Sequence, residues 1–91
     1  MMDRKKIKKI LADGFEEGNQ SYFDLDDTYR IYCYVDDNNG FWDTCIHMAI
    51  DNNFTRKIDL FETHCDMCDK AMFEENVDWL LDKYEEMIKK G

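Results

Sequence analysis

Several features that would place a protein in a functional class are missing from this sequence. It contains no proline, and no repeat, low-complexity stretch or linker divides its 91 residues, so a single small domain, 1–91, is predicted. No apolar run approaches the length of a membrane span, and the basic N-terminus is not followed by the hydrophobic region of a signal peptide. We therefore expect a soluble, cytoplasmic protein without a membrane partner.

Catalytic signatures are also missing. Ser21 is the only serine, and His47 and His64 are the only histidines that could act as bases. The sequence has neither a Gly-rich phosphate loop nor a nucleotide-binding fingerprint. Cys45 and His47 would share one face of a strand, but such neighbours usually just pack against adjacent side chains. We therefore expect a protein that is not an enzyme.

Basic residues are scarce in the body of the chain. The 21 acidic residues outnumber the 12 basic ones, and the formal net charge is −9. Most bases lie near the two termini, so residues 13–86 contain 20 acidic and 5 basic residues. Such a field repels nucleic acid and anionic membranes, and it attracts basic protein surfaces. We expect a basic protein surface as the partner and no direct binding of nucleic acid.

The clearest structural signal is a β-hairpin. Residues 29–50 read YRIYCYVDDNNGFWDTCIHMAI, two β-prone apolar runs joined by a polar turn at Asn39-Gly40. The apolar residues of the two runs share a face only if paired residue numbers sum to an odd value. A turn at Asn39-Gly40 has that parity and predicts that Ile31 pairs with Met48 and that Cys33 pairs with Ile46. The opposite face would carry Tyr32, Tyr34, Asp36, Asp43, Cys45 and His47.

Helical periodicity appears on both sides of this hairpin. Asp3 to about Phe15 predicts an amphipathic helix, and Gly18 is a stop signal for it. A second amphipathic helix is predicted from Asp66 or Asp69 to Lys89. Its apolar stripe consists of Phe73, Val77, Leu80, Leu81, Tyr84 and Ile88.

Two segments remain between these elements. Residues 16–28 are acidic and fit a loop or a short edge strand equally well. Thr55 to Thr63 predicts a third strand with Ile58 and Leu60 inward and Phe61 outward. We therefore predict an α+β fold with an N-terminal helix, a three-stranded antiparallel meander and a C-terminal amphipathic helix, the helices covering one face of the sheet. The expected core includes Ile31, Trp42, Ile46, Met48, Leu60, Leu80 and Tyr84.

Cys65 and Cys68 form a Cys-x2-Cys pair, a spacing found in half of many zinc sites. A tetrahedral zinc ion needs four ligands, so His64 or one of Cys33, Cys45 and His47 would have to complete the set. An alternative prediction is therefore a small zinc-binding domain that uses His64, Cys65, Cys68 and Cys45. The leading expectation is no cofactor, with the cysteines reduced.

The acidic surface is the leading functional candidate. Carboxylates spaced along strands and helices can take the positions of phosphates in the basic groove of a nucleic-acid-binding protein. We predict that the hairpin tip and the neighbouring segment 24–27 form one partner-binding surface. Its candidate residues are Asp24, Asp26, Asp27, Tyr32, Tyr34, Asp36, Asp37, Asn38, Asn39 and Asp43. The alternative is a solvated face that only keeps the protein soluble.

The order of helix, antiparallel sheet and acidic helix, together with the acidic segment Asp36-Asp37-Asn38-Asn39-Gly40, resembles that of small phage-encoded anti-CRISPR proteins. These proteins block the DNA-binding groove of a CRISPR nuclease. The resemblance covers most of the chain in topology. It implies a DNA-mimicking inhibitor without enzymatic activity, whose partner processes nucleic acid.

Overall fold

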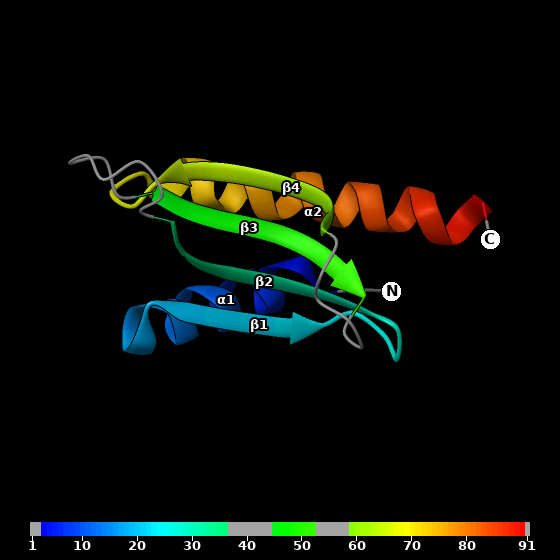
Figure 1. The fold of residues 1–91 in the computed structure, drawn as a ribbon, viewed down its shortest axis with the longest axis horizontal. Helices are drawn as coiled ribbons and strands as arrows, with labels where there is room; N and C mark the ends of the chain where they lie inside the picture. The colour runs from blue at the N-terminus through cyan, green and yellow to red at the C-terminus, as the bar shows by residue number, and fades with distance from the viewer. Residues whose placement is uncertain (1–2, 37–44, 53–58, 91) are drawn as a thin grey trace.

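The computed structural model describes residues 3–36, 45–52 and 59–90 (Figure 1). The elements, in chain order, are α1 (Arg4–Gly18), β1 (Gln20–Asp24), β2 (Tyr29–Asp36), β3 (Cys45–Asn52), β4 (Asp59–Asp66) and α2 (Lys70–Lys90). The predicted α+β fold and both predicted helices are confirmed. The described sheet has four strands where three were predicted, because part of the acidic segment 16–28 forms the short strand β1.

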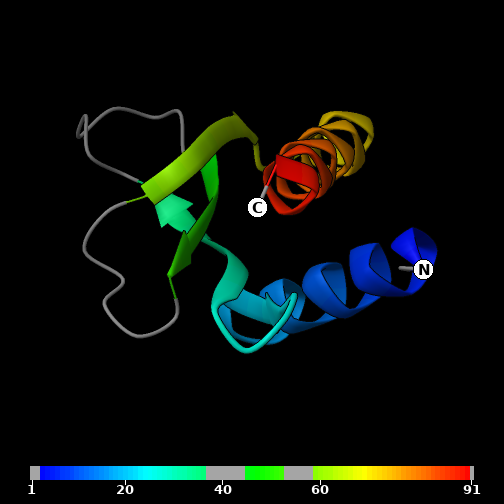
Figure 2. The ribbon, with the colours of Figure 1, turned by 90° about the vertical axis from the view of Figure 1, so that its right-hand side faces the viewer.

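The protein consists of two layers. The strands form an antiparallel meander in the order β1-β2-β3-β4. Both helices cover the same face of this sheet, with α1 against β1 and β2 and α2 against β3 and β4 (Figure 2). We call the opposite side of the sheet the helix-free face.

The ends of α1 are set by local hydrogen bonds. The Asp3 carboxylate accepts a hydrogen bond from the Lys6 N–H at 3.2 Å, which caps the first turn. At the other end Asn19 adopts a left-handed conformation with φ 60°, and its N–H donates to the Phe15 carbonyl at 2.7 Å. Gly18 is therefore the last helical residue, as the sequence predicted, and this turn leads the chain directly into β1.

The core lies between the sheet and the two helices. Leu11 of α1, Ile31 and Met48 of the hairpin, and Leu80 of α2 are almost completely buried there. The predicted apolar stripe of α2 is confirmed at Phe73, Val77, Leu80, Leu81 and Tyr84. Ile88 is an exception: it is exposed in the final turns of the helix.

The hairpin has the predicted faces but not the predicted register. Ile31 pairs with Ile50 and Cys33 with Met48, so each partner lies two residues further along than expected. A shift by two keeps the parity of the pairing, so the apolar residues still face the helices. The hydrophobic pattern therefore determined the face and left the register open. The proposed turn at Asn39-Gly40 and Trp42 lie outside the described residues.

The orientation of β4 was predicted wrongly. Leu60 is 40% exposed, whereas Phe61 packs against the core. The reason is an irregularity in the pairing of β3 with β4: Ile50 pairs with Phe61, but Asp51 pairs with Asp59, which leaves Leu60 as the extra residue. A bulge exchanges the inward and outward positions, and an alternating pattern in one sequence does not reveal it. Ile58 lies outside the described residues.

Close contact between α1 and β1 depends on Gly14. A Cβ atom at this position would lie 2.8 Å from the Cβ of Ser21. The Ser21 hydroxyl donates to the Leu11 carbonyl at 2.7 Å and lies 3.0 Å from the Cys33 sulfur. The only serine in the chain therefore attaches the edge strand to the first helix.

Gly14→Ala should lower the free energy of unfolding by about 1–2 kcal/mol. Alanine is intrinsically better than glycine inside a helix by roughly 0.5–1 kcal/mol, but overpacking against a fixed backbone costs about 1–3 kcal/mol. Gly18→Ala is the matched control, because an added Cβ there meets no atom within 4 Å. Urea unfolding of the two variants should give changes of opposite sign or clearly different size; equal effects would mean that the helix and strand are not in close contact.

Candidate functional site

The meander and the helix ends give the sheet two chemically distinct ends. We call one the hairpin end, where β2 finishes at Asp36, β3 begins at Cys45 and β4 finishes at Asp66. Because α1 ends just before β1 and α2 begins just after β4, the C-terminus of α1 and the N-terminus of α2 also lie there. The other end, which carries the β1–β2 turn at residues 25–28, we call the turn end (Figure 1).

The predicted partner-binding residues are divided between these two ends. Asp24, Asp26 and Asp27 lie at the turn end, whereas Asp36 lies at the hairpin end. The eight residues of β2 separate them, which corresponds to about 25 Å. Among the described candidates, the segment 24–27 and Asp36 therefore do not adjoin, because one precedes β2 and the other ends it. The remaining candidates, Asp37, Asn38, Asn39 and Asp43, lie outside the described residues.

Asp24 has an internal partner. Its Oδ1 atom lies 2.6 Å from Nε of Arg30, and this hydrogen bond raises the pKa of the Arg30 guanidinium. The guanidinium carbon of Arg30 also lies 4.1 Å from the ring centroid of Tyr22. The charge of Asp24 is thus compensated within the helix-free face.

Asp26 organises the β1–β2 turn. Its carboxylate accepts hydrogen bonds from the N–H groups of Thr28 at 2.7 Å and Tyr29 at 2.8 Å, and from the Tyr84 hydroxyl at 2.6 Å. Burial opposes ionisation of Asp26, but the Tyr84 hydroxyl and the two amides outweigh it and lower the pKa of this carboxyl. Burial and Asp26 together raise the pKa of Tyr84 to about 12. Asp26 therefore connects the turn to α2.

Tyr84→Phe should lower the free energy of unfolding at neutral pH by about 1–2 kcal/mol, because a hydrogen bond to a charged acceptor is lost in a partly exposed site. The folded pKa of Asp26 lies below its ordinary value of 3.8, so this contribution is present above that pH and disappears as pH falls through the folded value. Urea unfolding should thus show a smaller difference between variant and wild type at about pH 3 than at pH 7. Tyr22→Phe, which removes a hydroxyl from an exposed ring, should change little at either pH; a Tyr84 effect that does not depend on pH would contradict the role of Asp26.

The two predicted tyrosines differ in accessibility. Tyr32 and Tyr34 stack on the helix-free face with ring centroids 5.8 Å apart, but Tyr32 is buried and Tyr34 is exposed. His47 lies against the Tyr34 ring at 4.9 Å, and its Nδ1 atom is 2.6 Å from Nε2 of His64. Tyr32 therefore offers little surface to a partner, whereas Tyr34 is accessible. The pairing of the two histidines was missed because the predicted third strand ended at Thr63, whereas β4 extends to Asp66 and includes His64.

The four candidate zinc ligands are not brought together. His64 and Cys65 are consecutive on β4 and project to opposite faces, with His64 exposed on the helix-free face and Cys65 buried in the core. Cys68 is exposed in the turn before α2, where its N–H donates to the Asp66 carboxylate at 2.9 Å. Within residues 3–36, 45–52 and 59–90, no group of three or more His, Cys, Asp or Glu side chains could hold a metal ion. Of the Cys-x2-Cys pair, Cys65 is thus a core residue and Cys68 is a turn residue.

The buried cysteines are unsuited to nucleophilic chemistry. Burial raises the pKa of the Cys33 thiol to about 11, against the opposing effect of the Ser21 hydroxyl. Burial also raises the pKa of Cys65, with a smaller contribution from Asp69. Both thiols are protonated at neutral pH, and a thiol is a much weaker nucleophile than a thiolate.

Basic residues of the first helix are neutralised by the last helix. Arg4 lies 2.7 Å from Asp82, 3.3 Å from Asp78 and 3.3 Å from Glu85, and Lys8 lies 2.7 Å from Asp78. Burial opposes ionisation of Asp78, but Lys8 and Arg4 outweigh it and lower the pKa of this carboxyl. This network crosses between α1 and α2, so the acids on that side of α2 are compensated.

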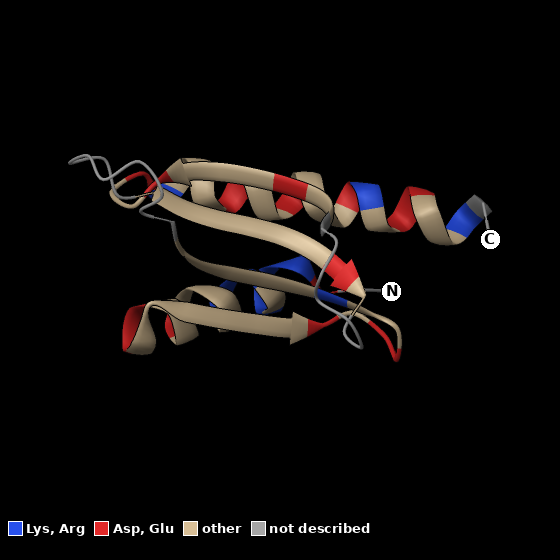
Figure 3. Ribbon diagram, in the orientation of Figure 1, with Lys and Arg blue, Asp and Glu red and all other residues tan. Residues whose placement is uncertain are grey.

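A different set of acids remains exposed at the hairpin end. Glu16 and Glu17 lie in the last turn of α1, Asp66 and Asp69 lie at the β4–α2 turn, and Glu74 and Glu75 lie early in α2 (Figure 3). In the described part of the chain, no basic group lies within 4 Å of the carboxylates of Glu16, Glu17, Glu74 or Glu75. The sequence analysis missed these residues as a group because they come from different elements that only the topology brings to one end.

No protein family, curated protein or solved structure was found to match this chain. Among the described residues, no helix is long and apolar enough to cross a membrane.

Proposed function

We propose that this chain is a cytoplasmic, non-enzymatic interaction protein that occupies a basic groove on a nucleic-acid-processing protein. The observation that supports the proposal is the collection of exposed carboxylates at the hairpin end. They come from the end of α1, the β4–α2 turn and the start of α2. Asp36 ends β2 at the same place, so the acidic segment that follows it begins there.

Internal pairing of the bases strengthens this reading. Arg4, Lys8, Lys9, Arg30 and Lys83 each lie within 4 Å of a carboxylate of the same chain. The net charge of −9 that a distant partner experiences already includes these bases, and their internal pairing leaves the excess negative charge on carboxylates elsewhere on the surface. Carboxylates displayed on a rigid end of the sheet can take the places of phosphates, competing with nucleic acid for the partner's arginine and lysine side chains.

The narrower form of this proposal is a DNA-mimicking inhibitor similar to the anti-CRISPR proteins. It rests on the acidic hairpin sequence and on the order of helix, antiparallel sheet and acidic helix. The broader form requires only a basic groove on a nucleic-acid-binding partner. Zinc binding is the weaker proposal, because His64 and Cys65 project to opposite faces of β4.

The experiment begins with capture of a partner by the immobilised protein from the cell that produces it. We expect the retained protein to bind nucleic acid, and we call it the captured partner. Its association rate should fall steeply as salt is raised, because the screening length decreases from about 10 Å at 0.1 M to about 3 Å at 1 M salt. An association rate that does not depend on salt would contradict the proposal.

A further inference from the structure

The strand β1 has one open edge. It pairs with β2 on one side, and no strand in the described part of the chain pairs with it on the other. The Leu25 N–H donates to the Tyr29 carbonyl at 2.9 Å, which identifies this as a hydrogen-bonded pair. Hydrogen-bonded and non-hydrogen-bonded pairs alternate along an antiparallel ladder. The residues whose backbone N–H and C=O groups point away from β2 are therefore Gln20, Tyr22 and Asp24.

This edge lacks the protection that β4, at the other side of the sheet, possesses. The pairing of β4 with β3 contains a bulge, and Glu62 and Asp66 place charges along the strand. In contrast, β1 pairs regularly with β2 over all five of its residues. Its one charged residue, Asp24, lies at its last position and is paired with Arg30. Only its short length limits the addition of a further strand.

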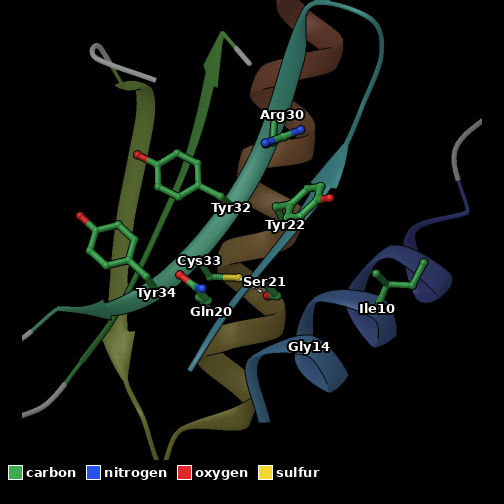
Figure 4. Close-up of a pocket in the computed structure, with 9 residues that line it drawn as sticks. All are labelled: Ile10, Gly14, Gln20, Ser21, Tyr22, Arg30, Tyr32, Cys33 and Tyr34. Atoms are coloured by element: carbon green, nitrogen blue, oxygen red, sulfur yellow. Dashed lines mark hydrogen bonds between the residues drawn. The ribbon is translucent and has the colours of Figure 1, made fainter. Parts of the chain in front are cut away.

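A concave surface follows this edge (Figure 4). Ile10 and Gly14 of α1 line it on the helix side, and Gln20 and Tyr22 line it on the helix-free side. Ile10 is 37% exposed and Tyr22 is 56% exposed. Side chains of an added strand would alternate between these two sides and would meet an apolar group on each.

Charge indicates what kind of strand would bind. Asp13, Glu16 and Glu17 lie in the last turns of α1, beside the N-terminal end of β1, where the helix dipole adds partial negative charge. A second copy of this chain would place the same acids, and the same net charge of −9, against them. Basic side chains in the added strand would be attracted instead.

We propose that the open edge of β1 binds an extended, basic segment of the partner as a fifth strand of the sheet. This inference rests on the proposed function, because it specifies how a basic partner is held. The segment contributes backbone hydrogen bonds to the outward groups of Gln20 and Tyr22, apolar contacts to Ile10 and Tyr22, and basic side chains near Glu16 and Glu17.

The test is amide hydrogen exchange of the whole chain, followed residue by residue. The probe is a peptide of alternating arginine and valine, and the control is the corresponding peptide of glutamate and valine. The outward N–H group of Tyr22 should exchange quickly in the free protein. It should exchange at least about tenfold more slowly with the basic peptide and at an unchanged rate with the acidic one.

Two variants separate backbone pairing from side-chain contact. Tyr22→Ala removes the side chain, and Tyr22→Pro removes the side chain and the outward N–H, a change that edge strands accommodate. Tyr22→Pro should bind the basic peptide roughly 2–10-fold more weakly than Tyr22→Ala, which corresponds to one net hydrogen bond. Both variants should retain the circular dichroism spectrum of the wild type.

The possible outcomes are distinct. Protection of Tyr22 that increases with protein concentration in the absence of peptide would overturn the inference in favour of a second copy. Binding of the basic peptide that protects only the hairpin-end amides would also overturn it, while the proposed function would stand. No binding of the basic peptide at low salt would contradict both.

Discussion

Leu80→Ala should lower the free energy of unfolding by about 2–5 kcal/mol, the range for removing a fully buried leucine side chain. Leu80 has no exposed surface and belongs to the core cluster that joins α2 to the sheet. The same cluster contains Ile46 and Met48 of β3, which are buried as well. We therefore expect the buried side chains around position 80 to move little, so that the cavity left by Leu80→Ala remains largely unfilled. Chemical denaturation monitored by circular dichroism measures the change.

The neighbouring residue provides the control. Trp79 precedes Leu80 on α2 but is 41% exposed, and the Lys83 ammonium lies 5.5 Å from its ring centroid. Trp79→Ala removes a larger side chain, yet it should cost less than about 1 kcal/mol because that side chain is exposed. A loss below about 1 kcal/mol for Leu80→Ala, or a larger loss for Trp79→Ala, would mean that α2 packs on the sheet through another face.

Glu16→Lys combined with Glu17→Lys should weaken binding to the captured partner by roughly 10–100-fold. The double change replaces two attractive carboxylates with two ammonium groups that face the partner's own bases, and like-charge contacts at an interface cost several kcal/mol before screening. Most of the loss should appear in the association rate. The fold should be retained, since both residues are exposed and lysine is favourable in the last turn of a helix. Surface plasmon resonance measures the rates.

Asp27→Lys combined with Glu86→Lys is the matched control, because it changes the net charge equally. Asp27 is exposed at the turn end, and Glu86 is exposed near the end of α2 with a weak contact to Lys83 at 3.7 Å. Both positions lie far from the hairpin end. If the two double variants weaken binding alike, only the overall field matters; if neither does, the acidic surface is simply solvated.

The helices and the faces of the hairpin could be predicted because local periodicity determines them. Val77, Leu80 and Leu81 recur at helical spacing, and all three are buried. In the hairpin the alternation of apolar residues requires an odd pairing sum, and the observed pairing of Val35 with Ile46 satisfies it. The helices and the faces of the hairpin depend on which side chains are apolar. A single sequence shows this directly.

Properties that depend on contacts between distant segments could not be predicted. The bulge beside Leu60 exchanges the faces of β4 without any change in composition. The strand β1 depends on the close approach that Gly14 allows, since residues 20–24 alone fit a loop equally well. The meander also places Asp26 and Asp36 at opposite ends of β2 and brings Glu16 beside the hairpin end. The sequence therefore indicated that the candidate site is made of carboxylates. Which carboxylates lie together depends on the topology of the sheet and could not be predicted.

The most direct test of the central claim is competition between this protein and nucleic acid for the captured partner. A fluorescently labelled duplex bound to the partner is titrated with the protein, and the anisotropy of the duplex is measured. If exposed carboxylates occupy the phosphate-binding groove, the duplex should be released completely, and the variant with lysine at positions 16 and 17 should release it only at higher concentration. A ternary complex, in which the partner holds the duplex and the protein together with undiminished affinity for each, would contradict the account.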